Sequence, residues 1–288
     1  MTHAQIPAIA TELSRAIEFI ASGRATTADE LYALWYAAPC RPLQISDGLP
    51  PDLAEMLRAA HPGFRDWEPG WRVEDVGTRG QVIARRGTDL RMVDRIDYAA
   101  PTGSALLPSP GDVIVVAGRR DRVDPGDGWW RTAAESWEWA NPPRPLVRLF
   151  YSVAVEQLPI LVERLLTTLQ VARDPWMLKC ATAHSSYVRA DAVVLFVTPV
   201  ILGTLANACV DAATGDPGRP PLTFPVTAGL AMAYDPGGGE SFGSNRCRVL
   251  FESQPTTVDD VHAAFERNGI APERPWANIG DLKLPWEQ

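Results

Sequence analysis

A lysine within an apolar segment is the first feature of the chain that suggests chemistry. Lys179 lies in the segment Trp176–Cys180, and it is one of two lysines among 27 basic residues. Burial disfavours a charged amine and lowers its pKa, and nearby arginines would act in the same direction, so Lys179 could serve as a general base near neutral pH. The alternative is a lysine that reaches solvent from the edge of a sheet.

Three arginines could supply the positive charge that binds an anion. Arg148 lies in the apolar segment Val147–Tyr151, Arg189 lies two residues before Asp191, and Arg246 follows a glycine-rich run. A guanidinium group stays charged and can bind phosphate through two parallel hydrogen bonds, so the three side chains could converge on one phosphate. Alternatively, each arginine pairs with a carboxylate, and Asp191 would share a strand face with Arg189.

The glycine-rich run Asp235–Gly243 has backbone N–H groups that few side chains would cover. Such a loop could surround a phosphate, or it could simply join two strands. It lacks the spacing of a P-loop and of the GxGxxG motif, which argues against nucleotide binding. It also lacks the GxSxG motif of the serine hydrolases.

The histidines and cysteines do not predict a metal site. The four histidines have no HExxH spacing, and the four cysteines have no CxxC spacing. His184 follows Lys179 by five residues in a predicted loop, where it could act as a general acid, although a surface histidine is the alternative interpretation.

The composition excludes several classes of protein. With 46% apolar and 22% charged residues, the 288-residue chain can form a core and is not disordered. Its net charge of -8 argues against a broad nucleic-acid-binding face. No segment resembles a signal peptide, and no apolar run is long enough to span a bilayer. We therefore expect a cytoplasmic protein with neither nucleic-acid nor membrane partners.

The spacing of apolar residues predicts a mixed α+β fold, with a mainly antiparallel sheet flanked by helices. Residues 1–65 predict an N-terminal helical region, in which Thr27 caps a second helix together with Glu30. Residues 66–288 predict an α+β domain, in which 126–139 forms a loop that leads into a short helix. Strands are expected at 71–74, 81–84, 90–93, 112–116, 147–153, 176–180, 192–197, 228–233 and 247–251, and helices at 156–171, at 200–213 and after Thr256 or Thr257.

Three stretches, in this order, resemble the HopA-type effector family: Val147–Tyr151, then Trp176–Cys180 with Tyr187–Val197, and then Asp235–Gly243 with Arg246 and Arg248. Its bacterial biosynthetic relatives are the phosphoserine/phosphothreonine lyases of lanthipeptide- and thioamitide-type clusters for peptide natural products. The resemblance extends from about Trp71 to Phe251, and it is strongest in Tyr187–Phe196 and in Asp235–Gly243 with Arg246–Arg248. Position 245 is asparagine here, where many relatives carry histidine.

The resemblance implies a β-elimination that needs no metal, nucleotide or redox cofactor. A kinase similar to aminoglycoside phosphotransferases would phosphorylate serine or threonine in a precursor peptide. The lyase would then remove the Cα proton and expel phosphate, which leaves dehydroalanine or dehydrobutyrine. The implied site consists of Lys179 as the base, His184 or Tyr187 as proton donor, Arg148, Arg189 and Arg246 as phosphate ligands, and Asp191, Ser241 and Gly238 as supporting residues.

Two other functions fit the same residues. The first is a non-catalytic protein that binds a peptide, a host protein or the kinase, with tryptophans such as Trp129 and Trp137 forming either a recognition surface or part of the core. The second is an enzyme that acts on a phosphorylated or carboxylated small molecule. A single cavity lined by Lys179 and the arginines would favour catalysis, whereas dispersed side chains would favour binding.

Overall fold

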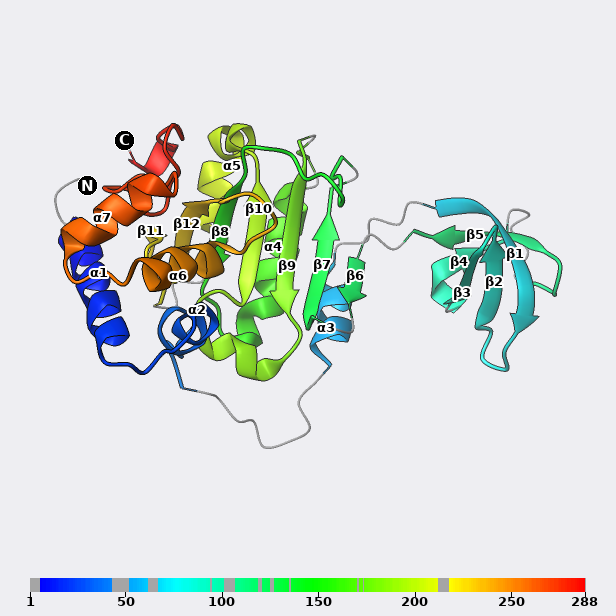
Figure 1. Cartoon of the computed structure of the whole chain (residues 1–288). Coiled ribbons are helices and arrows are strands. Elements are labelled where there is room, and N and C mark those ends of the chain that lie inside the picture. Colours follow the sequence, from blue (N-terminus) through cyan, green and yellow to red (C-terminus); the bar gives the residue numbers. More distant parts are fainter. Residues whose placement is uncertain are drawn as a thin grey trace. The chain divides into compact units, whose positions relative to one another are not determined.

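The chain forms two compact units. The computed structural model describes residues 6–42, 52–61, 67–93, 95–100, 107–118, 121–124, 127–134, 136–169, 171–172, 174–211 and 218–287. One unit consists of Met1–Pro62 together with Val123–Gln288, and the other consists of Gly63–Arg122 (Figure 1). This division differs from the sequence-based boundary at residue 65, because the N-terminal helices pack with the C-terminal half of the chain.

The smaller unit is built on a five-stranded antiparallel sheet with the strand order β3-β2-β1-β5-β4. Its strands are β1 (Trp67–Val76), β2 (Val82–Arg86), β3 (Asp89–Val93), β4 (Tyr98–Ala99) and β5 (Val113–Ala117). Alternation along β1 and β5 buries Trp71, Val73, Ile114 and Val116 in a small core of their own. The four strands expected between residues 71 and 116 are therefore confirmed, and β4 adds a short edge strand.

The larger unit contains a seven-stranded sheet with the order β11-β12-β8-β10-β9-β7-β6. Its strands are β6 (Asp121–Asp124), β7 (Trp129–Ala133), β8 (Val147–Tyr151), β9 (Trp176–Ala181), β10 (Val193–Val197), β11 (Phe224–Thr227) and β12 (Leu230–Tyr234). From β11 to β7 every neighbouring pair is antiparallel. Every residue of β8, β10 and β12 is buried, as expected for central strands covered on both faces.

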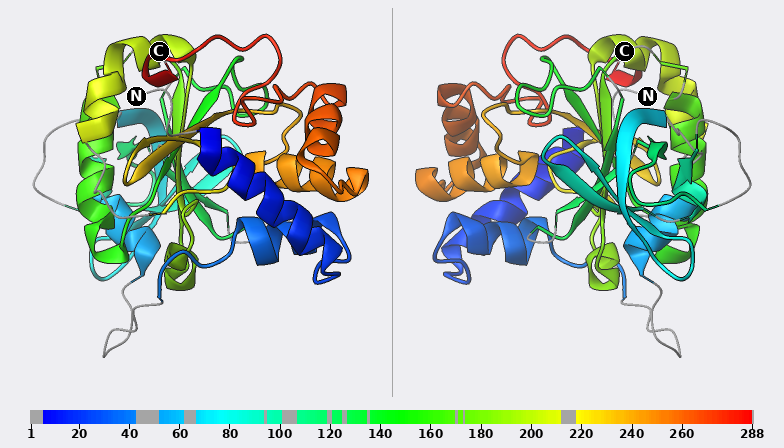
Figure 2. Two further views of the ribbon diagram at one scale, coloured as in Figure 1. Left: turned by 90° about the vertical axis from the view of Figure 1, so that its left-hand side faces the viewer. Right: turned by 90° about the vertical axis from the view of Figure 1, so that its right-hand side faces the viewer.

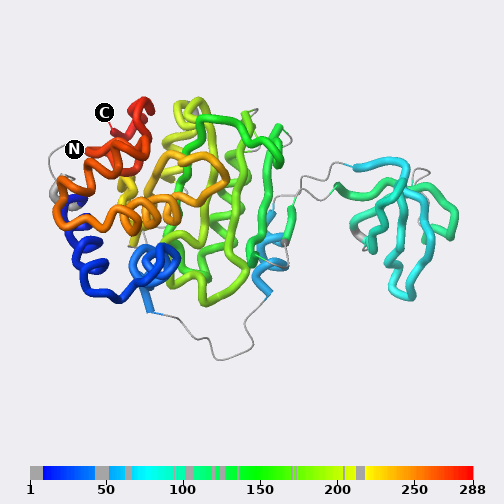
Figure 3. The backbone as a smooth tube through the Cα atoms, viewed as in Figure 1, coloured from blue at the N-terminus to red at the C-terminus, as the bar shows by residue number. Residues whose placement is uncertain are grey.

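Helices cover both faces of this sheet, as the edge-on views in Figure 2 show. One face carries α1 (Ile6–Ala21), α2 (Ala28–Leu31) with the π-helical turn Tyr32–Tyr36, α6 (Phe242–Ser253) and α7 (Val258–Arg267); the other carries α3 (Leu53–Ala60), α4 (Leu158–Leu169) and α5 (Pro199–Asp211). The tube in Figure 3 shows that α1 and α7, from opposite ends of the chain, lie side by side. The α+β class is thus confirmed, but the predicted N-terminal helical layer is divided, because α2 packs against α6 and α3 against α4.

The segment Cys247–Phe251, expected as a strand, lies within helix α6, so that prediction was wrong. Ser241 caps this helix, since its side chain accepts a hydrogen bond from the N–H group three residues further on. The buried residues Phe242, Arg246 and Val249 follow at helical spacing. A short apolar run alone does not distinguish a strand from a buried helical segment. In this protein the N-cap at Ser241 begins a helix that includes the run.

The segment 126–139 also differs from its prediction, because it contains strand β7 rather than only a loop before a helix. Trp130 and Thr132 are fully buried on one face of this strand. Trp129 and Trp130 therefore belong to a strand of the sheet, whereas Trp137 and Trp139 follow it.

Two predicted helix caps are confirmed. The Thr27 side chain accepts a hydrogen bond from the N–H of Glu30 at 3.1 Å. Thr257 forms a complete capping box with Asp260 at the start of α7.

Candidate functional site

Lys179 and Arg148 lie on the same face of the seven-stranded sheet. Lys179 of β9 is paired with Arg131 of β7 on one side and with Val194 of β10 on the other. Val194 is in turn paired with Phe150 of β8. Because side chains alternate along a strand, Arg148, two residues before Phe150, faces the same side.

A small cavity on this face brings several of the predicted residues together. Its volume is about 30 Å³. Four of the residues that line it belong to the site that the resemblance implies: Lys179, Arg148, Asp191 and Ser241. The others are Tyr32, Tyr36, Trp129, Phe150, Val194, Phe242 and Gly243.

The Lys179 ammonium group lies in aromatic and cationic surroundings. Its Nζ atom is 4.1 Å from the ring centre of Trp129 and 5.8 Å from that of Phe196. Burial, and next the positive charge of Arg148, lower the pKa of Lys179 from 10.5 to about 8, while Asp191 acts in the opposite direction. A substantial fraction of this amine is therefore neutral near pH 8, as a general base must be.

Arg148 is held by the glycine-rich run. Its Nε and Nη2 atoms donate to Oδ2 of Asp235 at 2.8 and 2.5 Å, and Nη2 also donates to the carbonyl oxygen of Glu240 at 2.8 Å. The other oxygen of Asp235 accepts the N–H of Gly237 at 2.7 Å. Gly238 has a φ of 66° and does not line the cavity, so it shapes this loop without facing the site. Nη1 of Arg148 has no hydrogen bond to any residue that the structure describes.

Arg189 pairs with Asp191 rather than lining the cavity. Its Nε and Nη2 atoms donate to the two carboxylate oxygens at 2.8 and 2.7 Å. Nη2 also donates to the Tyr32 hydroxyl at 2.7 Å, and that hydroxyl donates to Asp191 at 3.2 Å. Burial and the Asp191 carboxylate raise the pKa of Tyr32 to about 12. Arg189 therefore orients two residues that do line the cavity.

Arg246 is fully buried in helix α6 and does not line the cavity. Its Nε atom donates to the carbonyl oxygen of Pro275 at 2.8 Å, and its Nη1 atom donates to the side chain of Asn245. The guanidinium group lies 4.5 Å from the ring centre of Phe242, and burial lowers its pKa to about 9. The three arginines thus do not converge on one cavity; Arg148 alone of the three lines it.

His184 and Tyr187 belong to the short 3₁₀ helix His184–Val188, and neither lines the cavity. The Tyr187 hydroxyl is buried and donates to the carbonyl oxygen of Ala181 at 2.9 Å. Burial raises the pKa of Tyr187 well above its ordinary value. In this arrangement Tyr187 anchors the turn after β9.

The sequence reasoning missed the aromatic residues contributed by the N-terminal helices. Tyr32 and Tyr36 stack with their ring centres 5.4 Å apart, and both line the cavity. Their i, i+4 spacing within an amphipathic segment was consistent with simple packing. Nothing in the local pattern indicates that this turn meets strands more than 100 residues away.

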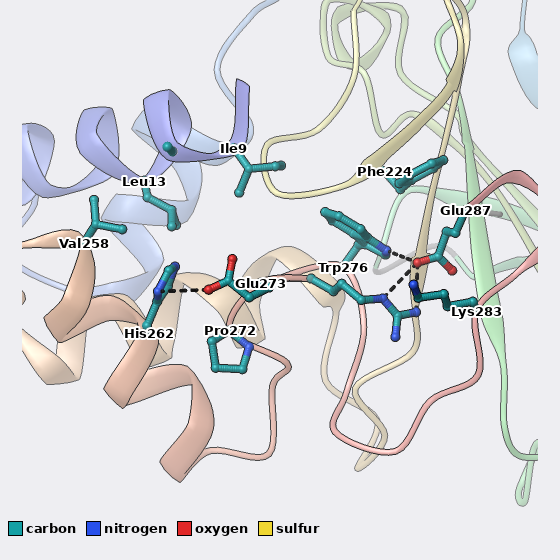
Figure 4. A pocket seen from close by; sticks show the side chains of 12 residues that line it. Ile9, Leu13, Phe224, Val258, His262, Pro272, Glu273, Trp276, Lys283 and Glu287 are labelled. Carbon is teal, nitrogen blue, oxygen red and sulfur yellow. Dashed lines mark hydrogen bonds and ion pairs between the residues drawn. The ribbon is translucent and has the colours of Figure 1, made fainter. Parts of the chain in front are cut away.

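A larger cavity, of about 420 Å³, lies among α1, α7 and the C-terminal segment (Figure 4). Glu287 accepts hydrogen bonds from Trp276 and Arg274 on its wall, and His262 lies 3.8 Å from Glu273 at the other end. None of the predicted site residues lines it.

Metal-binding clusters and membrane-spanning helices are both absent from the described part of the chain. No group of three or more histidine, cysteine, aspartate or glutamate side chains there could hold a metal ion. The helices within the described ranges are all too short or too polar to cross a bilayer.

Comparisons with known proteins identify the family. No curated protein matches the chain. The solved structure of the effector protein from Pseudomonas syringae pv. tomato strain DC3000 is similar, with a TM-score of 0.57 and 13% identity over 95% of this chain and 98% of that one. The effector protein from Pseudomonas syringae pv. syringae strain 61 gives a TM-score of 0.59 and 13% identity over 93% and 96%. These likenesses establish a shared fold.

The model of the HopA1 effector protein family matches residues 131–276, just over half of the chain. The match includes strands β8, β9 and β10, the glycine-rich run and helix α6, and hence most of the residues that line the small cavity. The chain therefore belongs to the HopA1 effector protein family.

Proposed function

We propose that this protein is a phosphoserine/phosphothreonine lyase that eliminates phosphate from a phosphorylated precursor peptide. The observation that supports the proposal most directly is that Lys179 and Arg148 line one cavity. A base and a phosphate ligand within the same cavity are the two groups that such an elimination requires.

The chemistry that we propose uses the neutral amine of Lys179. Its Nζ atom takes the Cα proton, the electrons of that C–H bond form the Cα=Cβ double bond, and the Cβ–O bond breaks with its electrons leaving on phosphate. The products are dehydroalanine or dehydrobutyrine, free phosphate and a protonated Lys179. The elimination is redox-neutral, so it needs neither an oxidant nor a reductant.

Arg148 is the proposed phosphate ligand. Its Nη1 atom is available, and its other nitrogens bind Asp235 and Glu240. A cavity of about 30 Å³ holds only one or two water-sized groups, which is less than a phosphorylated residue occupies, so the substrate must widen it on binding. We therefore expect the phosphoryl group to displace Asp235 from part of the guanidinium, which keeps Arg148 paired throughout.

The proposed reaction requires a phosphorylated substrate, and a phosphotransferase-like kinase is the proposed partner that supplies it. A kinase that uses ATP would place both steps in the cytoplasm. The precursor peptide would be the only ligand that the lyase itself needs.

The test is mass spectrometry of a phosphoserine or phosphothreonine peptide that has been incubated with the purified protein without nucleotide. We expect the peptide to lose the mass of phosphoric acid. Lys179→Met should abolish the loss, whereas Lys283→Met, which removes the other lysine of the chain from an exposed position, should retain it.

Two results would count against the proposal. If the wild-type protein binds the phosphopeptide but releases no phosphate, even with the kinase present, the site is a phosphopeptide-binding site. If both lysine variants keep full activity, Lys179 is not the base.

A further inference from the structure

The Tyr36 hydroxyl is a buried polar group without a partner. Tyr36 is 4% exposed, and its hydroxyl has no hydrogen-bond partner among the described residues. An unsatisfied buried donor destabilises the folded state, so native proteins rarely keep one without a reason. Because Tyr36 lines the cavity that contains Lys179 and Arg148, a ligand in that cavity is the natural partner.

The neighbouring residue Tyr32 provides a comparison, because its hydroxyl has hydrogen-bond partners within the protein. The Tyr32 hydroxyl accepts a hydrogen bond from Arg189 and donates one to Asp191. Both tyrosines belong to the same π-helical turn and line the same cavity. The difference between them is that the hydroxyl of Tyr32 is satisfied by the protein and that of Tyr36 is not.

The surroundings hold the Tyr36 ring in a fixed position. The ring stacks on Tyr32 and lies 6.3 Å from the ring of Phe242. Gly243 adjoins it on α6, where a side chain would collide with the ring. A donor held this firmly loses little freedom when it binds, which is the requirement for stabilising a charge that develops during a reaction.

The protonation state limits what Tyr36 can do. Burial, and next the negative charge of Asp191, raise the pKa of the phenol well above its ordinary value, so the group stays neutral and protonated. A phenol with a raised pKa releases its proton reluctantly, but it remains a hydrogen-bond donor at all working pH values. It therefore suits an oxygen that gains charge without taking a proton, as the protonated donors of known oxyanion sites do.

We propose that the Tyr36 hydroxyl donates a hydrogen bond to the carbonyl oxygen of the phosphorylated residue itself. This inference rests on the proposed lyase function. When Lys179 takes the Cα proton, the electrons of the broken C–H bond spread onto this carbonyl oxygen. They return to form the Cα=Cβ bond as the Cβ–O bond breaks, and Tyr36 keeps its proton throughout. The cationic Arg148 is the better match for the phosphate, which leaves the neutral donor for the carbonyl oxygen.

The experiment compares Tyr36→Phe with the wild-type protein on one phosphopeptide. We expect kcat to fall about 100-fold or more, as it does when a single oxyanion donor is removed, with KM nearly unchanged. The kinetic isotope effect for a substrate deuterated at Cα should be retained or increased, because Cα proton removal becomes slower. The larger unit, which contains Tyr36, should unfold at the same temperature or a higher one, because phenylalanine removes only the unsatisfied hydroxyl.

Tyr32→Phe is the matched control, since it removes a hydroxyl from the same turn. It breaks the hydrogen bonds to Arg189 and Asp191 and should lower the unfolding temperature. A lower unfolding temperature in Tyr32→Phe but not in Tyr36→Phe would separate a structural contact from a substrate contact.

Three results would overturn the assignment of Tyr36. They are an unchanged kcat, a rise in KM that alone accounts for the lost activity, and an unfolding temperature that falls as it does in Tyr32→Phe. If the wild-type protein eliminates no phosphate, the proposed function and this inference fail together. If the wild-type protein and Tyr36→Phe are equally active, only the inference fails.

Discussion

A Cβ atom on Gly243 would lie 2.6 Å from Cδ1 of Tyr36 and 2.7 Å from Cε2 of Tyr32. Gly243 is therefore the position on α6 that admits both tyrosines to the cavity. We expect Gly243→Ala to displace at least one ring, to destabilise the protein by about 1–3 kcal/mol and to reduce the rate of elimination. Chemical denaturation and the phosphopeptide assay would measure the two effects.

Gly203 in helix α5 provides the control for this substitution. A Cβ atom there would meet no atom within 4 Å. Gly203→Ala should therefore raise stability by up to about 1 kcal/mol, as alanine does in a helix interior, and leave activity unchanged. Equal stability of the two variants would show that the tyrosines are not tightly held by α6.

The activity should depend on pH through Lys179. Because the neutral amine is the base, kcat/KM should rise with pH to a plateau above about 8, which is the pKa of this lysine. Asp191 raises this pKa and Arg148 lowers it. The midpoint should therefore move to lower pH in Asp191→Asn, and a shift to higher pH would contradict the assignment.

The same pKa makes a prediction about stability. The pKa of Lys179 in the folded protein, about 8, lies below its ordinary value of 10.5, so the charged form is disfavoured by folding. This cost is complete below pH 8, decreases as the folded protein loses the proton between pH 8 and 10.5, and is absent above that range. Lys179→Met should therefore raise the free energy of unfolding by about 1–3 kcal/mol at pH 7, and the gain should vanish at high pH.

Lys283→Met is the control for the stability measurement, because Lys283 is exposed. We expect its free energy of unfolding to change by less than about 0.5 kcal/mol at either pH. A gain from Lys179→Met that does not change with pH would mean that packing, rather than charge, is responsible.

The ion pair between Arg148 and Asp235 should be essential to the fold of the site. The side chains are 8% and 15% exposed. Removing one partner leaves the other charge buried and unpaired. Asp235→Ala should therefore lower the free energy of unfolding, measured by chemical denaturation, by about 3–5 kcal/mol. Glu252→Ala, which removes a 60% exposed partner of Arg248, should cost less than about 1 kcal/mol.

The double variant Arg148→Met/Asp235→Leu separates stability from function. Apolar side chains of similar size remove both charges together, so much of the lost stability should return. Elimination should remain absent, since the phosphate ligand is missing. Recovery of activity in this variant would exclude Arg148 from the reaction.

The strands that position the site could be predicted because their apolar runs are unusual. Val147–Tyr151 and Val193–Val197 are buried along their whole length, and runs of that kind at strand length leave few alternatives. Arg148 and Lys179 are each the only charged residue of a strand that is otherwise apolar, and both line the cavity.

The rest of the site depends on contacts that local pattern does not encode. The Cys247–Phe251 run was apolar enough for a strand, yet the cap at Ser241 and burial along one side make it part of α6. Tyr32 and Tyr36 reach the sheet only because α2 packs on α6, a contact between segments separated by about 200 residues. Arg246 matched the expected residue type, but its place in a helix turns it away from the cavity.

The division of the chain into two units affects how its unfolding should be interpreted. Each unit has a separate hydrophobic core, and the smaller one interrupts the sequence of the larger. We therefore expect two cooperative transitions rather than one. Trp67 and Trp71 belong to the smaller unit and the other eight tryptophans to the larger, so fluorescence would report mainly on the unit that contains the cavity. A single melting temperature would mix two equilibria, of which only one responds to the reacting residues.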